Sequence, residues 1–244
     1  MEKMFSSVRP GGRHKPNDCL ARERVAIISP YKNRPYHLRT FLYNLHPFLQ
    51  RQQLDYGIYM VEQADNAPIN QGKLQNIGFV EALKEYNYSC FIIHDNDLVP
   101  ENDYNLYTCS EHPRHVAASQ NKFRYKYPFP WYFGGAVALT KEHMEALNGY
   151  SNEYWGWGGE DDDIHNRFHA VYHGVSRWKT DGLNNLMYKK IDMRHYKLYT
   201  WILVDLLYNE TRNTGIPIFH IDQDIQANTT TKKMEKIGLR KRRQ

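Results

Sequence analysis

The chain has 244 residues, a hydrophobic fraction of 41% and 19 tyrosines, so it can build one sizeable folded domain and is not disordered along most of its length. Much of its formal charge of +5 lies in the tail between Lys232 and Gln244, and no zinc-ligand spacing, aromatic RNA-binding motif or basic helix face accompanies it, so nucleic acid is not the expected partner. No stretch is long enough to span a membrane and the first residues lack the apolar core of a signal peptide, so no anchor is predicted in this chain.

The first half of the chain alternates between strand and helix patterns after a polar lead-in over 1–23. The predicted elements are a strand over 25–29 that Pro30 stops, an amphipathic helix over 38–53, a strand over 56–63, a helix over 73–86 and a strand over 89–97 that ends in acids. This alternation is typical of a parallel sheet with helical crossovers, in which ligands bind beyond the carboxyl ends of the strands.

The second half of the chain continues the pattern. We expect a strand over 132–139 that begins with small residues, and a short helix that Thr140 caps and Gly149 ends. A further helix begins at Glu160, with Ile164 and Phe168 on its apolar face. Because no repeat or linker divides the chain, the prediction is a single α/β domain.

Two acids at the end of the third strand form a D-x-D pattern. Side chains alternate along an extended segment, so Asp95 and Asp97 point to the same side. Such a pair suits a hard cation such as Mn²⁺ or Mg²⁺, which prefers oxygen ligands and can bridge to a diphosphate. Polar turns also contain D-x-D by chance, but the position after the third strand favours a metal site.

The stretch "WGWGGEDDDI" over 155–164 places an aromatic, glycine-rich turn before four consecutive acids. Acids at a helix N-terminus are often simple caps. Capping does not explain the two indole rings, whose flat faces match those of pyranose rings on a turn that glycines allow to move. We interpret the stretch as a sugar platform beside a carboxylate that accepts a hydroxyl proton.

Several long motifs resemble the catalytic domain of the β-1,4-galactosyltransferase family: "GGRHKPNDC", "SPYKNRPYHL", "HPFLQRQQLDYGIY", "FIIHDNDLVPENDYN", "YFGGAVALT" and "NEYWGWGGEDDDI". The resemblance runs from 11 to 174 and resumes over 181–205. It implies a GT-A fold, a Rossmann-like α/β domain whose mixed, mostly parallel sheet is flanked by helices. It also implies an inverting, Mn²⁺-dependent transfer in the Golgi, from UDP-galactose to the 4-hydroxyl of an N-acetylglucosamine-type glycan or a related acceptor.

The resemblance also implies a role for individual residues. Asp161 would be the catalytic base, with Glu160 and Asp162 beside it, and Asp97 would bind manganese. The acceptor would lie against Trp157, Asp161 and Asp162. The donor or its nucleotide would contact Pro30, Tyr31, Lys32, Arg34, Asp95, Lys122, Tyr132, Gly135 and Trp157. Cys90 and Cys109 match a family disulfide.

The chain departs from the family pattern in three places. Ile69 and Gln71 replace an aromatic residue and an arginine of the nucleotide site. The chain passes from Thr180 directly to Asp181, without the long loop that supplies a Met-x-His metal pair and covers the acceptor. The expected domain plan is therefore a stem remnant over 1–23, a catalytic domain over 24–205 with this deletion, and an unrelated basic extension over 206–244.

Two hypotheses remain open at the level of the sequence. The first is a galactosyltransferase with a shortened acceptor loop, and the second is a catalytically impaired family member that only binds UDP-sugar or glycan. A glycoside hydrolase would also use paired carboxylates, but it needs no nucleotide site, so the D-x-D pattern argues against it.

Overall fold

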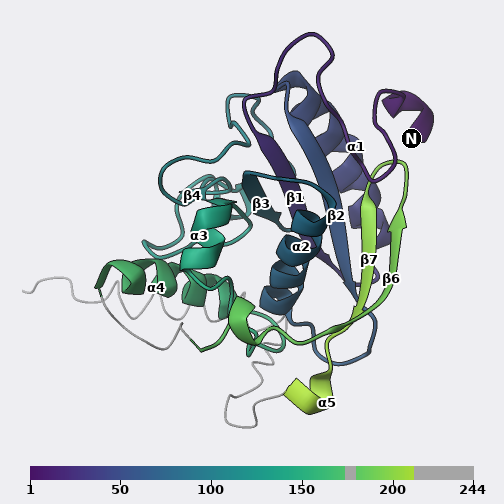
Figure 1. The fold of residues 1–244 in the computed structure, drawn as a ribbon. Coiled ribbons are helices and arrows are strands. Elements are labelled where there is room, and N and C mark those ends of the chain that lie inside the picture. Colours follow the sequence, from purple (N-terminus) through teal and green to yellow (C-terminus); the bar gives the residue numbers. More distant parts are fainter. Residues whose placement is uncertain (174–179, 212–244) are drawn as a thin grey trace, which may run out of the picture.

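The computed structural model describes residues 1–173 and 180–211. They form one seven-stranded sheet, in the order β4-β5-β3-β1-β2-β7-β6, with helices on both faces (Figure 1). The strands are β1 (Arg24–Tyr31), β2 (Asp55–Gln63), β3 (Cys90–His94), β4 (Arg114–His115), β5 (Ala136–Thr140), β6 (Lys189–His195) and β7 (Thr200–Asp205). The helices are η1 (Glu2–Phe5), α1 (Pro35–Arg51), α2 (Gln71–Glu85), η2 (Asn121–Phe123), α3 (Lys141–Ala146), α4 (Glu160–His173), η4 (Leu183–Asn185) and α5 (Tyr208–Thr211).

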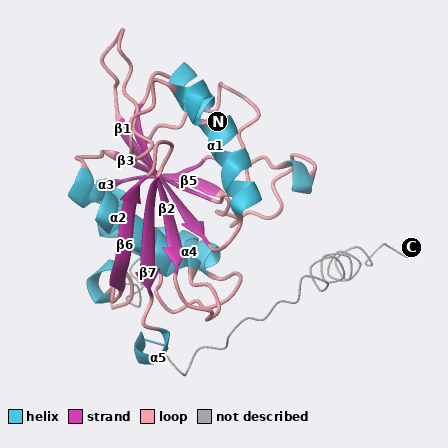
Figure 2. Cartoon of the chain, turned by 90° about the vertical axis from the view of Figure 1, so that its right-hand side faces the viewer, coloured by secondary structure: helices cyan, strands magenta, loops and turns pink. Residues whose placement is uncertain are grey.

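The sheet is mixed, as predicted, but it is not mostly parallel, because three of its six strand pairs are antiparallel. The pairs β1·β2, β1·β3 and β2·β7 are parallel and form the centre. The pairs β3·β5, β4·β5 and β6·β7 are antiparallel, so parallel pairing is confined to the four central strands. The strands fan out in Figure 2, as expected from the twist that L-residues impose on neighbouring strands.

The helices bury one apolar cluster on each face of the sheet. On one face, α1 contributes Phe41, Leu45 and Leu49, all fully buried. On the other face, α2 contributes Leu74 and Ile77. A Cβ at Gly78 would lie 2.3 Å from a methyl carbon of Ile28, so glycine lets α2 approach β1 closely. Figure 1 shows α1 and α2 on opposite sides of the strands.

Three strands begin or end two or more residues away from the sequence-based prediction. β3 ends at His94, so Asp95 and Asp97 lie in a turn after the strand, with Asp95 partly buried and Asp97 exposed. The side-chain alternation that was expected to point both acids to the same side does not apply there.

β1 continues through Pro30 to Tyr31. Proline is tolerated there because pairing with β3 has already ended at Ile28, so its missing N–H faces no partner strand. β5 begins at Ala136, because Gly135 has a positive φ of 88° and breaks the extended run.

Segments outside the predicted catalytic domain pack against it. In the lead-in over 1–23, Phe5 and Val8 are buried in the cluster beneath α1, and His14 forms a β-bridge with Tyr56. At the other end, Leu206 is fully buried. The basic tail from Lys232 to Gln244 lies outside the described residues.

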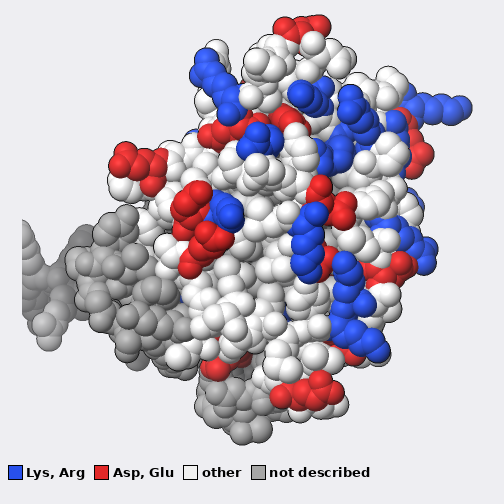
Figure 3. Space-filling view, in the orientation of Figure 1, with Lys and Arg blue, Asp and Glu red and all other residues white. Residues whose placement is uncertain are grey.

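Charged side chains of both signs are interspersed on the face shown in Figure 3, including the side formed by β6 and β7. Lys190 there donates to Glu81 at 2.5 Å, and Arg194 to Asp192 at 2.6 Å. On this face charged residues of opposite sign therefore pair with one another. Within residues 1–173 and 180–211, no helix has the length and apolar character needed to cross a membrane.

Candidate functional site

A cleft of about 450 Å³ lies beyond the carboxyl ends of the central strands. The chain passes from β1 to β2 on one side and reaches β3 on the other, so strand order reverses at β1, where open α/β sheets bind ligands. The cleft is lined by the end of β1, the loops after β1, β2 and β3, and the turn before α4. Its lining residues are Pro30, Lys32, Arg34, Asn66, Ala67, Pro68, Ile69, Gln71, Asp95, Asn96, Asp97, Gly156 and Trp157.

Polar contacts hold these loops around the cleft. The Lys32 ammonium donates to the carbonyl of Ala67 at 2.6 Å, which joins the loops after β1 and β2. The Asn96 amide donates to the carbonyl of Pro30 at 2.8 Å, which joins β1 to the D-x-D segment. The cleft is therefore preformed by contacts between segments distant in sequence.

Arg34 connects the two sides of the cleft. Its guanidinium lies 3.4 Å from the carboxylate of Asp97 and 5.6 Å from the ring centre of Trp157. The Asp97 and Trp157 side chains are 39% and 42% exposed, so both are accessible to a ligand. Cations and carboxylates thus face the same space, an arrangement suited to a diphosphate together with a metal ion.

The acids at the start of α4 have different environments. Glu160 is buried against α2, Asp161 is partly buried and Asp162 is exposed. Asp163 accepts from Arg167 at 2.5 Å and so stabilises the helix rather than the cleft. Asp163 is therefore paired within the helix, whereas Glu160, Asp161 and Asp162 differ in exposure.

Burial and mutual repulsion perturb this acidic group. Burial, and then the charge of Asp161, raises the pKa of Glu160. Burial, and then the charge of Asp162, raises the pKa of Asp161, which Lys122 opposes. Burial also raises the pKa of Asp95, and the charges of Asp161, Asp97 and Glu160 raise it further. The charges at the start of α4 therefore act on the Asp95 carboxyl group of the D-x-D segment.

Asp95 links the cleft to a second, much smaller cavity. This cavity has a volume of about 10 Å³, and Asp161 and Gly135 line it with Asp95. Asp161 also approaches Gly134 so closely that a Cβ there would lie 2.2 Å from its Oδ2 atom. Asp161 thus lies beside the cleft, packed against the backbone that leads into β5.

Four predicted donor residues lie outside the lining of the cleft, and one of them, Gly135, lines the smaller cavity beside Asp95 instead. Tyr31 is 8% exposed and belongs to the apolar cluster beneath α1. Lys122 is exposed on η2, but its charge lowers the pKa of both Asp95 and Asp161. The Tyr132 phenol accepts a hydrogen bond from Gln120 at 2.8 Å, and burial, with the charges of Asp161 and Asp95, raises its pKa to about 12.

Asp97 presents an accessible carboxylate at the cleft. Among the described residues, the one group of three or more potential ligands that lie close together is Glu23, Cys90 and Cys109. Its two cysteines are bonded to each other, so that group is not a metal site. The donor chemistry of Asp97 fits Mn²⁺, and the remaining ligands would come from phosphate and water oxygens.

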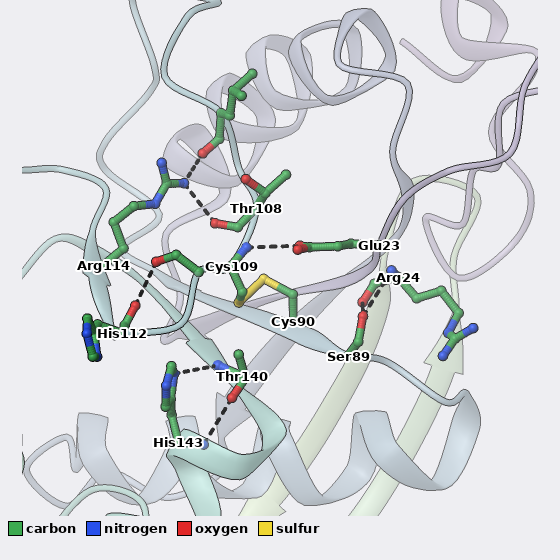
Figure 4. The surroundings of a disulfide bond; sticks show 12 residues. Glu23, Arg24, Ser89, Cys90, Thr108, Cys109, His112, Arg114, Thr140 and His143 are labelled. Atoms are coloured by element: carbon green, nitrogen blue, oxygen red, sulfur yellow. Dashed lines mark hydrogen bonds between the residues drawn. A yellow bond between two sulfur atoms is a disulfide. The ribbon is translucent and has the colours of Figure 1, made fainter.

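The predicted disulfide between Cys90 and Cys109 is present, with Cα atoms 5.5 Å apart (Figure 4). It joins the first residue of β3 to the loop that leads to β4. The carboxylate of Glu23 accepts from the backbone N–H of Cys109 at 2.9 Å beside it. Cys19 is a free thiol.

The predicted junction between Thr180 and Asp181 forms a turn behind α4. Thr180 is exposed, whereas Asp181 accepts from the backbone of Asn152 at 3.0 Å and pairs with Arg167 at 3.1 Å. Neither residue lines the cleft of about 450 Å³.

Sequence reasoning missed part of the cleft lining. Asn66, Ala67 and Pro68 belong to the loop after β2, and only their position after a strand signals a role. Asn96 lies inside the D-x-D pattern and supports it through Pro30. Ile69 and Gln71, identified as departures from the family pattern, do line the cleft, so those substitutions fall where a ligand would bind.

Comparisons with known proteins place the chain among glycosyltransferases. Residues 1–110 match the family model for the N-terminal region of glycosyl transferase group 7, and residues 114–193 match the model for the N-terminal domain of galactosyltransferase. The chain is 43% identical to β-1,4-galactosyltransferase 1 of Mus musculus, over 84% of this chain and 60% of the relative. It is 46% identical to β-1,4-galactosyltransferase 4 of Homo sapiens, over 81% and 67%.

A solved structure gives the same fold. The crystal structure of a mutant Drosophila β-1,4-galactosyltransferase 7, in complex with manganese, UDP-Gal and xylobiose, has a TM-score of 0.66 and 26% identity. The match covers 78% of this chain and 97% of that chain, which confirms the predicted GT-A fold.

The alignments with the curated relatives also contain a gap. The chain spans 60 to 67% of the length of the mouse and human relatives. The mouse alignment extends over 241 positions but uses 84% of the 244 residues, which is about 205. More than thirty positions of that relative therefore have no counterpart in this chain.

Proposed function

We propose that the chain, which belongs to the β-1,4-galactosyltransferase family, transfers galactose from UDP-galactose to a sugar acceptor. The acceptor is an N-acetylglucosamine-type or related glycan of glycoproteins or glycolipids, and the new linkage is β-1,4. One observation carries the proposal. The cleft of about 450 Å³ brings the end of β1, the D-x-D segment and Trp157 together, next to the acids of α4.

The cleft binds the UDP part of the donor. Lys32 and Arg34 supply positive charge for the diphosphate, and Asp97 holds Mn²⁺. When bound, Mn²⁺ neutralises negative charge on the departing diphosphate. Pro30 and Gln71 contribute to the walls around the nucleotide. The manganese, UDP-Gal and xylobiose bound to the Drosophila relative support this assignment.

The acids of α4 act on the sugars. Burial raises the pKa of Asp161 above that of an ordinary carboxyl, which makes it a stronger base for the acceptor hydroxyl proton. Glu160 and Asp162 accept hydrogen bonds from sugar hydroxyls. Trp157 is exposed at the cleft and provides a flat face for a pyranose ring.

The disulfide supports an oxidising compartment. A bond between Cys90 and Cys109 persists in an oxidising lumen rather than in a reducing cytosol. We assign the chain to the Golgi lumen, where its family acts.

A second candidate function is binding of UDP-sugar or glycan without efficient transfer. The alignment gap favours it, because we place the missing stretch between Thr180 and Asp181 and identify it with the acceptor lid. Without a lid, interactions made only in the closed state are lost, and these supply much of a transferase rate.

Two measurements on the purified chain separate the candidates. The first is calorimetric binding of UDP-galactose with Mn²⁺, and the second is UDP release with and without N-acetylglucosamine. A transferase binds the donor and releases UDP faster when the acceptor is present. Binding without acceptor-stimulated release supports the second candidate. Absence of UDP-galactose binding contradicts the transferase and the UDP-sugar-binding form of the second candidate.

A further inference from the structure

Gln75 is a buried amide whose environment does not satisfy it. It lies on α2, is 3% exposed, and its Oε1 atom has no hydrogen-bond partner among the described residues. A buried polar group without a partner costs free energy, so an orphaned amide in a folded core usually indicates an ordered water or ligand.

The unpartnered amide faces the small cavity next to the proposed catalytic base. The cavity of about 10 Å³ is lined by Gln75, Tyr150, Asp95 and Asp161, with the remaining walls formed by Ile93, Phe133, Gly135, Ala136 and Val137. This volume is close to what one water molecule occupies, and a stable buried water needs two to four polar partners. A sugar ring would not fit.

The polar groups around the cavity complement a water molecule. A water donates two hydrogen bonds, and the Gln75 carbonyl and a carboxylate are acceptors for them. Tyr150 is 1% exposed, and burial, with the charges of Asp161, Glu160 and Asp95, raises the pKa of its phenol well above its usual value. The phenol therefore keeps its proton and can donate to the water oxygen.

From this geometry we propose that Gln75 is a positioning residue, which acts on Asp161 through one buried water in the cavity of about 10 Å³. The water fixes the orientation of the Asp161 carboxylate before the sugars arrive. The effect of the water on turnover rests on the proposed galactosyl transfer, but the presence of the water in the cavity does not.

A crystal structure of the chain at high resolution tests the water directly. The expected result is a water within hydrogen-bond distance of both Gln75 Oε1 and an Asp161 carboxylate oxygen. A dry cavity overturns the inference, whatever the activity of the chain. If the chain neither binds UDP-galactose nor transfers galactose, the proposed function fails. The crystal structure still decides whether the water is present.

Substitution of Gln75 tests its effect on the base. Gln75→Leu and Gln75→Met keep most of the side-chain volume but remove the amide. We expect kcat to fall about tenfold with KM for UDP-galactose within about twofold, because the loss affects the oriented base rather than donor binding. Gln50→Leu, on α1 across the sheet, is the matched control and should keep the wild-type kcat.

The same two substitutions can also contradict a positioning role for Gln75. If the Gln75 amide is merely misplaced in an apolar core, both substitutions should raise the Tm and leave kcat unchanged. That outcome overturns the positioning role.

Discussion

Gly134→Ala tests the position of Asp161 without altering its chemistry. A Cβ at Gly134 would lie 2.2 Å from Oδ2 and 2.9 Å from Cγ of Asp161. Ordinary Cβ contacts are no closer than 3.0 Å, so the carboxylate must retreat by about 1 Å. The backbone of Gly134 does not have a positive φ, so alanine introduces no strain of its own there.

A displacement of this size is costly for a base that must meet a hydroxyl group. A misplacement of about 1 Å lowers the rate about 100-fold, equivalent to about 2.7 kcal/mol in the activation free energy. The assay is UDP release from UDP-galactose with Mn²⁺ and N-acetylglucosamine. Binding of UDP alone should stay unchanged, because neither Gly134 nor Asp161 lines the nucleotide cleft.

A double-mutant cycle provides the control. In an Asp161→Ala background the clashing carboxylate is absent, so adding Gly134→Ala should cause no further loss. A Gly134→Ala variant that keeps at least half of the wild-type rate would show that the position of Asp161 does not limit catalysis. An equal loss of rate in both backgrounds would show that the substitution does not act through Asp161.

Asp97→Ala should abolish Mn²⁺-dependent UDP binding in calorimetry, because Asp97 is the accessible carboxylate at the cleft. Asp103 lies outside the cleft, so Asp103→Ala should keep this binding. Equal binding by both variants would contradict the metal assignment. Replacing Cys90 and Cys109 by serine should lower the free energy of unfolding by about 3 kcal/mol, because their disulfide restricts the unfolded chain across a sequence separation of 19. A loss of less than about 1 kcal/mol in a denaturant titration would contradict this stabilising role. Burial lowers the pKa of His46 from 6.5 to about 4, so below pH 6.5 the unfolded chain takes up a proton that the folded chain does not. The free energy of unfolding should therefore fall by about 2 kcal/mol from pH 7 to pH 5, and His46→Gln should remove that part of the slope; an identical slope in the variant would disprove the assignment.

The strands β1, β2, β3 and β5 and the helices α1 and α2 were predictable because their apolar patterns are strong and the packing follows them. The hairpin of β6 and β7 was not, although β7 is one of the four central strands. β6 is largely exposed, so its sequence shows no alternation of apolar and polar residues. Its place at the sheet edge depends on pairing with β7, which pairs in turn with β2 over a long sequence separation.

The cleft residues of motifs that end a strand were predictable. Residues with polar side chains that the fold buries were harder to assign from the sequence. Tyr31 was assigned to the nucleotide by resemblance, but β1 extends past Pro30, and alternation along the strand turns Tyr31 toward α1. Asn76 is fully buried because its amide bonds the backbone of Tyr150, 74 residues away. No local pattern in the sequence shows such a long-range partnership. The buried Gln75 was missed because the cavity that it lines is formed by segments distant in sequence.

The sugar linkage of the reaction product shows whether the chain is a β-1,4-galactosyltransferase. The purified chain would be incubated with UDP-galactose, Mn²⁺ and N-acetylglucosamine, and the linkage of any product determined by NMR. The proposed function predicts a disaccharide in which galactose is joined to the 4-hydroxyl with a β anomeric configuration. Recovery of intact UDP-galactose, or of free galactose alone, would contradict it.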